Sequence, residues 1–332
     1  MMKKVLMVGI VALSLTTLGL IKRGYTAPPA VVQETITGDW TAKVKQTDRV
    51  PVLWLSLNHG SDSRKGRSQM SSDFPLQAFT GLNPNANSNV QFTLQREAGT
   101  IFFEGLFKDG RGVGDFRFTP NDGFIATMRN LGYDNLSTEK LFSMVALDVS
   151  TSYINELKSL GFDQLPLDQL FGMRALGVTA AFAKEAQEWG FGKLSANDLI
   201  EIKAMGITPD YIRSMKSLGF EDLSLRKLIE LKALGVNEAY VKEMRSTGFD
   251  NLPVNKFIEL KALGVNEDYV KEMRSVGFDN LPVNKLIELK AMGINADYVK
   301  KMRELGLKNL SVNELIEIKA TGADKILTRE KR

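Results

Sequence analysis

Apolar and polar side chains alternate along several short runs in the first third of the chain. The alternation is strict over residues 40–45 and 90–95, and the apolar residues of 101–107 and 116–118 continue it. Glycine and aspartate residues separate the later runs at short spacings, which is the pattern of antiparallel strands joined by hairpins. Residues 33–118 are therefore expected to form a β module.

Two further apolar runs, 52–57 and 76–79, bring the expected number of strands to six or seven. This number suffices for a small antiparallel sandwich or an open barrel. The polar stretches 58–68 and 83–89 are expected to be exposed loops between strands.

From residue 119 to residue 322 the pattern changes to a repeat of 29 residues, and a charged tail, 323–332, follows it. Leucine, glycine and aromatic positions keep this spacing over seven copies, which chance does not explain. The leucines of the series are Leu136, Leu165, Leu194, Leu223, Leu252, Leu281 and Leu310.

Each copy carries the signals of two short helices. In residues 252–280, Pro253 stands where a helix begins and Gly264 where it ends. Asn266 can cap a second helix, which Gly277 follows. One such hairpin cannot bury its own apolar stripe, so the copies must stack. The sequence predicts an α+β protein of two domains, an N-terminal antiparallel all-β module followed by an α-solenoid of two-helix repeats.

The first 27 residues have the features of an export signal. Lys3 and Lys4 precede a mostly apolar stretch, residues 5–21, that is just long enough to span a bilayer. A cleaved signal peptide and an uncleaved signal anchor both fit this pattern. The chain has no cysteine, which excludes disulfides and thiolate metal sites. We expect an extracytoplasmic protein, periplasmic or secreted, with residues 5–21 as an alternative anchor in the cytoplasmic membrane.

The formal net charge of +4 is unevenly distributed. Residues 1–118 carry 14 Lys/Arg and 9 Asp/Glu, which leaves the repeats close to neutral. A nucleic-acid-binding protein carries its positive excess on the binding domain. Because the repeats carry no such excess, no nucleic-acid partner is expected.

Basic side chains recur on the second helix of each copy and would form a row once the copies stack. One interpretation is a solvated face with ion pairs between copies. The other is a basic groove that binds an acidic peptide, an anionic envelope polymer or a membrane surface. This candidate binding stripe consists of Arg213, Lys216, Lys242, Arg245, Lys271, Arg274, Lys300 and Arg303.

Little in the chain indicates catalysis, and we assign no catalytic, cofactor-binding or metal-binding residue. His59 is the only histidine, and its polar surroundings predict a surface loop rather than a Ser/His/Asp group. The run Gly110, Gly112 and Gly114 lies between two expected strands, so it predicts a glycine hairpin rather than a phosphate loop. A glycosidase pair could come from four acidic residues that nothing ranks: Asp39, Asp73, Glu104 and Asp115.

Three short runs of the β module (38–40, 96–100 and 103–105) and the repeated sequence Leu-Ile-Glu-Leu-Lys-Ala-Leu-Gly resemble a family of bacterial envelope proteins. Its members join a small β module to two-helix repeats of the same length. The pair is similar to the extracytoplasmic C-terminal region of some membrane metallopeptidases of the β-lactam-sensor type. The resemblance implies display outside the cytoplasmic membrane. It implies no activity, because the peptidase motif His-Glu-x-x-His is absent.

These patterns favour a non-catalytic scaffold that binds a protein or peptide in the envelope, with a sensing domain as one form of it. One alternative is a carbohydrate-active or other hydrolytic enzyme with its site on the β module. Another is a structural spacer. No cofactor is expected.

Overall fold

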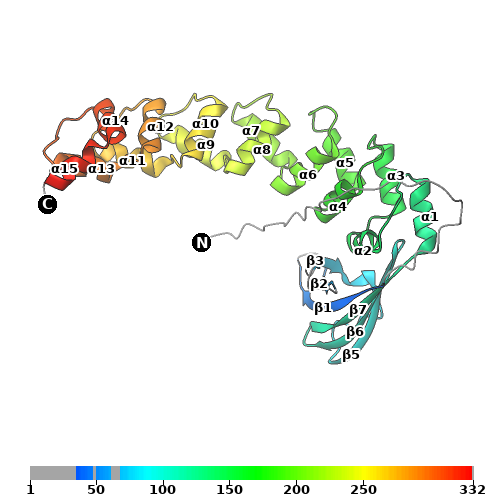
Figure 1. Cartoon of the computed structure of the whole chain (residues 1–332). Coiled ribbons are helices and arrows are strands. Elements are labelled where there is room, and N and C mark those ends of the chain that lie inside the picture. Colours follow the sequence, from blue (N-terminus) through cyan, green and yellow to red (C-terminus); the bar gives the residue numbers. More distant parts are fainter. Residues whose placement is uncertain (1–34, 48–49, 61–67, 331–332) are drawn as a thin grey trace, which may run out of the picture. The chain divides into compact units, whose positions relative to one another are not determined.

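The computed structural model of the chain describes residues 35–47, 50–60 and 68–330. The expected export signal, residues 1–27, lies outside the described residues. Within them the chain is an α+β protein that joins a curled, seven-stranded antiparallel sheet to a series of short helices (Figure 1).

The strands are hydrogen-bonded in the order β3-β2-β1-β7-β6-β5-β4. The sheet curls into a half-barrel, which is close to the open barrel that the alternation allowed. The described strands do not form the other expected arrangement, a two-sheet sandwich. The strands are β1 (Ile36–Lys45), β2 (Val52–His59), β3 (Ser68–Pro75), β4 (Phe79–Thr80), β5 (Ser88–Arg96), β6 (Gly99–Lys108) and β7 (Arg111–Pro120).

Two segments between β2 and β5 differ from the expectation. Residues 68–75 carry no apolar alternation, yet they form β3 because they pair with β2 along their whole length. Residues 76–79, expected as a strand, contain a 3-10 turn, η1 (Leu76–Ala78), and only Phe79 and Thr80 pair with β5. Pairing with β2, rather than the local pattern, makes residues 68–75 a strand, whereas within 76–79 only Phe79 has a partner on another strand.

One face of the sheet holds an aromatic core around Trp40. The indole is fully buried and packs edge-on against Phe92 and Phe103, at centroid distances of 5.3 and 6.0 Å. A Cβ on Gly112 would come within 2.6 Å of the indole, so glycine is needed there. Gly110 lies in the turn between β6 and β7 with a φ of 71°. The expected glycine hairpin is confirmed, and it serves the packing of Trp40.

The helices are short, eight to ten residues each, as the repeat predicts. The expected charged tail after Gly322 forms the last of them. The helices are α1 (Asp122–Asn130), α2 (Thr138–Leu147), α3 (Thr151–Ser159), α4 (Leu167–Ala175), α5 (Ala180–Gln187), α6 (Ala196–Met205), α7 (Pro209–Ser217), α8 (Leu225–Leu234), α9 (Glu238–Ser246), α10 (Val254–Ala262), α11 (Glu267–Ser275), α12 (Val283–Ala291), α13 (Ala296–Glu304), α14 (Val312–Thr321) and α15 (Ala323–Glu330).

The helix ends follow the expected residue types. Asn266 accepts a hydrogen bond from the backbone N–H of Tyr269 at the start of α11. Gly264 follows α10 with a φ of 70°, as its place in the repeat predicts. Pro253 is the N-cap residue of α10 and offers no side-chain acceptor, whereas Ser311 forms a capping box at the equivalent position.

Helices contact their counterparts in the neighbouring copies of the repeat. Among the first helices of each copy, α4 packs against α6, α6 against α8 and α8 against α10. Among the second helices, α3 packs against α5 and α11 against α13. These helices therefore pack against an equivalent helix rather than only against their own hairpin partner.

The recurring tyrosines are packing residues that also link the copies. The Tyr240 hydroxyl donates to the carbonyl oxygen of Val265 at 2.8 Å, and the ammonium of Lys261 lies 4.2 Å from the Tyr240 ring centroid. Burial raises the pKa of Tyr211 to about 12. The hydroxyl contact to a carbonyl 25 residues later recurs at Tyr153, Tyr211 and Tyr269.

Helix α2 packs on the aromatic face of the sheet. Phe142 stacks on Phe116 at a centroid distance of 5.6 Å and meets Phe118 edge-on at 5.5 Å. Arg96 of β5 donates to the carbonyl oxygen of Val145 at 2.6 Å. Val145 is fully buried at a position where the next copy carries Arg174 and the later copies carry a half-buried lysine. This contact explains why the first copy departs from the consensus.

Candidate functional site

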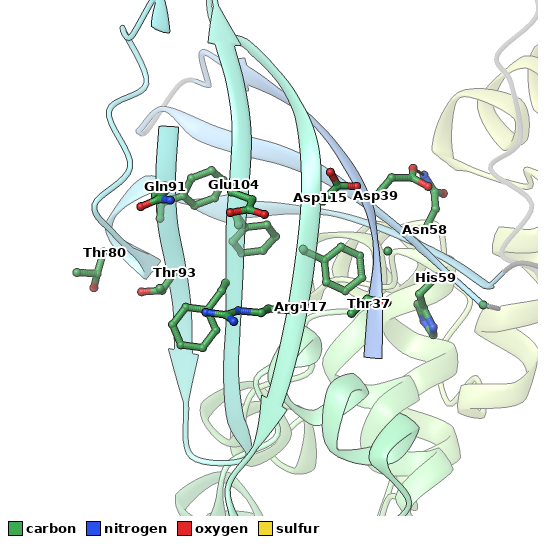
Figure 2. A pocket seen from close by; sticks show the side chains of 16 residues that line it. Thr37, Asp39, Asn58, His59, Thr80, Gln91, Thr93, Glu104, Asp115 and Arg117 are labelled. Atoms are coloured by element: carbon green, nitrogen blue, oxygen red, sulfur yellow. Dashed lines mark hydrogen bonds between the residues drawn. The ribbon is translucent and has the colours of Figure 1, made fainter. Parts of the chain in front are cut away.

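A cleft of about 870 Å³ lies against the sheet. Its volume is within the usual range of ligand sites, roughly 300–1,000 Å³. Figure 2 shows that the polar side chains of five strands lie along one line at this cleft. We name this line the acidic row; it consists of Asn58, Asp39, Asp115, Glu104 and Gln91.

The strand register brings the acidic row together. Asn58 lies opposite Asp39, which lies opposite Asp115. Asp115 lies opposite Glu104, which in turn lies opposite Gln91. Directly opposed residues point to the same face, with Cβ atoms about 4.5–5.5 Å apart. Three carboxylates from adjacent strands therefore stand side by side, with an amide at each end.

The core on the opposite face fixes the strands that carry two of these carboxylates. Trp40 Nε1 donates to the backbone carbonyl oxygens of both Glu104 and Asp115, at 3.1 Å each. Gly105 and Gly114 lie opposite each other beside these residues. A Cβ on either glycine would come within 2.2 or 2.0 Å of a backbone oxygen of the adjacent strand. The strands approach so closely here that only glycine fits.

A second line of side chains borders the acidic row. Arg117 lies opposite Phe102 on one side and Thr37 on the other. The Arg117 guanidinium is 4.9 Å from the Phe102 ring centroid, and Phe102 keeps 36% of its surface exposed. The cleft thus combines acceptors with an exposed aromatic ring and one cation.

The carboxylates of the acidic row have few partners in the chain. Asp39 accepts a hydrogen bond from Asn58 Nδ2 at 2.7 Å. Glu104 and Asp115 are exposed, and neither forms an ion pair within the part of the chain that the structure describes. Like charges directly opposite each other on adjacent strands destabilise a sheet. The charges of the acidic row therefore do not help to stabilise the sheet.

His59 does not lie in a surface loop, and that expectation is wrong. It is the last residue of β2, is only 7% exposed and continues the buried face of Leu55 and Leu57. Its ring packs edge-on against Phe142 at a centroid distance of 4.9 Å, and its Nδ1 lies 3.6 Å from the carboxylate of Glu139. Helix α2 covers this end of the strand, which the local sequence does not reveal.

Most members of the candidate basic stripe have partners within the chain. Three donate from Nη2 to a backbone carbonyl oxygen 27 residues earlier, at 2.6 or 2.7 Å: Arg245, Arg274 and Arg303. Four exposed members lie beside an acidic residue three or four positions earlier on the same helix: Arg213, Lys242, Lys271 and Lys300. Lys216 has neither kind of partner among the described residues. The stripe therefore alternates with carboxylates instead of forming a continuous basic surface.

The chemistry of the acidic row suits cations and hydrogen-bond donors. Ionised carboxylates only accept hydrogen bonds, whereas the amides of Asn58 and Gln91 both donate and accept. Ammonium, guanidinium, amide N–H and hydroxyl groups are complementary to this line. Within the described ranges, no group of histidine and acidic residues could hold a metal ion.

Three of the four acidic residues that the sequence offered are brought together, and the fourth is not. Asp73 lies on β3 and pairs with Lys45 at 2.8 Å. Sequence reasoning missed Asn58 and Gln91. The turn at Asp109 and Gly110 already implies that residues 104 and 115 oppose each other, but the pairing of β1 with β7 is long-range and has no local signal.

Comparison of the chain with protein-family models, with curated proteins and with solved structures found no match.

Proposed function

We propose that the chain is a non-catalytic binding protein whose acidic row binds a basic segment of a protein or peptide. The observation that carries this proposal is the line of three adjacent carboxylates in a cleft of about 870 Å³, where Arg117 lies over the Phe102 ring and forms no ion pair with them among the described residues. A lysine or arginine side chain laid across the strands would relieve the repulsion between the carboxylates and gain charge-assisted hydrogen bonds.

The helices serve as a scaffold in this proposal, stacked as an α-solenoid that forms a second domain behind the β module. The 29-residue repeat, the packing of each helix on its counterpart and the tyrosine bonds between copies support this arrangement. In an array of this kind each copy is stabilised mainly by its neighbours.

The basic stripe is less suited to be the main binding site. Three of its four arginines donate to backbone carbonyl oxygens, and all its exposed members except Lys216 lie beside carboxylates. An acidic peptide, an anionic polymer or a membrane surface would meet mixed charges there. A sensing role would require that binding on the sheet alters the helices, for which the contact of α2 with the sheet offers a route.

The proposed location is outside the cytoplasm, in the periplasm or secreted. The basic start and the apolar stretch 5–21 support it, as does the resemblance to bacterial envelope proteins. Among the described residues, no helix has the length and apolar character needed to cross a bilayer. Fusing residues 1–40 to a reporter that is active only outside the cytoplasm should give an active reporter; an inactive one would contradict the location.

The binding proposal is tested with labelled hexapeptides that are lysine-rich, glutamate-rich or neutral. Fluorescence anisotropy with the full chain should show a preference of at least about 10-fold for the basic peptide. Changing Asp39 and Asp115 to Asn and Glu104 to Gln should remove the preference. The matched control neutralises three helical carboxylates instead, Glu230→Gln, Glu259→Gln and Glu288→Gln, and should keep it. Equal loss in both variants would contradict a specific site.

A carbohydrate-active enzyme is the second candidate, because two facing carboxylates are also the minimal apparatus of a glycosidase. Asp39 with Asp115 and Asp115 with Glu104 both form such facing pairs. Release of reducing ends from neutral oligosaccharides, abolished by Asp115→Asn, would favour this candidate. If neither peptides nor oligosaccharides bind, the structural spacer is the better account.

A further inference from the structure

The junction between the copies of the repeat that contain α5 and α7 differs from the junctions that follow it. At the later junctions an arginine of the second helix reaches back to the end of the second helix in the preceding copy. Arg245 donates to the carbonyl oxygen of Leu218 at 2.7 Å. The same contact recurs at 2.6 Å from Arg274 to Thr247 and from Arg303 to Val276.

At the junction in question the equivalent residue is Lys216, and the equivalent carbonyl belongs to Trp189. Lysine lacks the forked guanidinium, and no side chain in the described part of the molecule donates to this carbonyl oxygen. A cavity of about 410 Å³ lies here instead. Besides Lys216, its walls include Trp189, Phe191, Met215, Phe220 and Asp222.

A lysine at this position does not by itself leave a cavity. Two copies earlier Lys158 holds the same place, but there Gln164 donates to the carbonyl oxygen of Leu131 at 3.2 Å. Tyr133 adds a hydrogen bond to the carbonyl oxygen of Leu165 at 2.9 Å. The space that remains is only about 10 Å³. The open cavity is therefore a property of the Lys216 junction and not of the repeat.

We propose that the cavity at Lys216 binds an arginine side chain of a partner polypeptide. The chain's own arginine fills the same space at the next junction, where the Arg245 guanidinium lies 5.7 Å from the Phe220 ring centroid. Phe191 and the Trp189 carbonyl provide the equivalent ring and acceptor at the open junction. An incoming guanidinium makes the contact that Lys216 does not make.

Charge at the rim of the cavity also favours a cation. Asp222 lines the cavity, whereas the equivalent residue at each of the three later junctions is an uncharged asparagine. Lys216 offsets this carboxylate, but its long, exposed side chain can turn its ammonium toward solvent. The asparagines concerned are Asn251, Asn280 and Asn309.

This proposal does not rest on the acidic row, and separate variants test the two sites. The probe is N-acetyl-arginine amide, titrated into the full chain with tryptophan fluorescence as the readout. N-acetyl-citrulline amide has the same shape without the charge and should bind at least about 10-fold more weakly. The response should disappear in Trp189→Phe. No saturable response, or equal affinity for both probes, would overturn the proposal.

Two substitutions of Lys216 should act in opposite directions. Lys216→Arg supplies an internal guanidinium to the Trp189 carbonyl and should weaken binding of the arginine probe by at least about 10-fold. Lys216→Met removes the competing charge without filling the acceptor and should tighten binding by about threefold. A merely structural role of Lys216 predicts the same direction for both. Unchanged affinity in Lys216→Arg would overturn the proposal.

Discussion

In the helical repeats a charged side chain usually has a partner in its own or a neighbouring copy, whereas the three adjacent carboxylates of the sheet form no ion pair within the part of the chain that the structure describes. Lys261 lies over the ring of Tyr240, and Arg274 donates to the carbonyl oxygen of Thr247. Glu104 and Asp115, by contrast, point their carboxylates to solvent. In the repeats these charged side chains contact other parts of the chain, whereas the carboxylates of Glu104 and Asp115 remain exposed to solvent.

Repetition explains this difference. A residue that recurs every 29 positions meets the same neighbours in each copy, so its charge is satisfied in all copies or in none. Each position on the sheet occurs only once, so a charged residue there can be specific to a ligand. By the same reasoning, the informative residues of the repeats are those that break the pattern, such as Lys216 and Asp222.

The largest expected effect concerns the buried core of the sheet. Trp40→Ala removes a fully buried indole and its two hydrogen bonds, so it should lower the free energy of unfolding of the sheet by about 3–5 kcal/mol. Trp54→Ala, at a half-buried site, should cost about 1 kcal/mol or less. Urea unfolding followed by near-ultraviolet circular dichroism measures both. Similar costs for the two substitutions would contradict the central place of Trp40.

Alkaline pH should weaken the repeats rather than the sheet. Burial raises the pKa of Tyr153 and Tyr211 to about 12, whereas an unfolded tyrosine titrates near 10. The folded state binds the phenolic proton more tightly, so this stabilisation is complete below pH 10 and is lost as the pH rises toward 12. Helical signal and absorbance at 295 nm should change together over this range.

Tyr211→Phe is the control for the alkaline transition. The variant lacks one titrating hydroxyl, so its stability should fall less steeply with pH than that of the natural chain. If the tyrosines titrate near pH 10 while the helices stay intact, the buried hydroxyl contacts do not persist in solution.

A smaller effect distinguishes the two kinds of basic residue in the stripe. Arg274→Ala leaves the carbonyl of Thr247 without its donor and should cost about 1–2 kcal/mol. Lys271→Ala on the same helix removes only an exposed pair with Glu267 and should leave the stability nearly unchanged. Thermal unfolding of both variants gives the comparison. Equal costs would mean that the arginine contact adds nothing to the junction.

The short helices of the second region could be predicted because the residues that start and end them are local. The caps at Asn266 and Ser311 and the glycine that ends every first helix from α4 to α14 all act within a few residues of their partners. The uses of Lys261 and Arg274 were not predicted, since their partners lie 21 and 27 residues away in another copy.

The candidate site was predictable only in part. The sequence indicated strands and offered Asp39, Glu104 and Asp115 among other acidic residues, but not their alignment across β1, β7 and β6. Strand β3 was missed because its polar sequence gains strand structure only from pairing with β2. The burial of His59 depends on α2, about 80 residues later in the chain, through Phe142. Long-range pairing, which single-residue patterns do not encode, decides each of these features.

The smallest expected effect tests whether the acidic row costs stability. Asp115→Asn removes the central charge of three, so it should raise the free energy of unfolding by about 0.5 kcal/mol. The gain should shrink at high salt, because ions screen the repulsion. Glu259→Gln in the repeats removes a favourable pair with Lys256 and should give no gain. A loss of stability in Asp115→Asn would assign the carboxylate to folding. A gain in stability, together with a loss of basic-peptide binding, would mean that the Asp115 carboxylate destabilises the sheet and serves to bind the ligand.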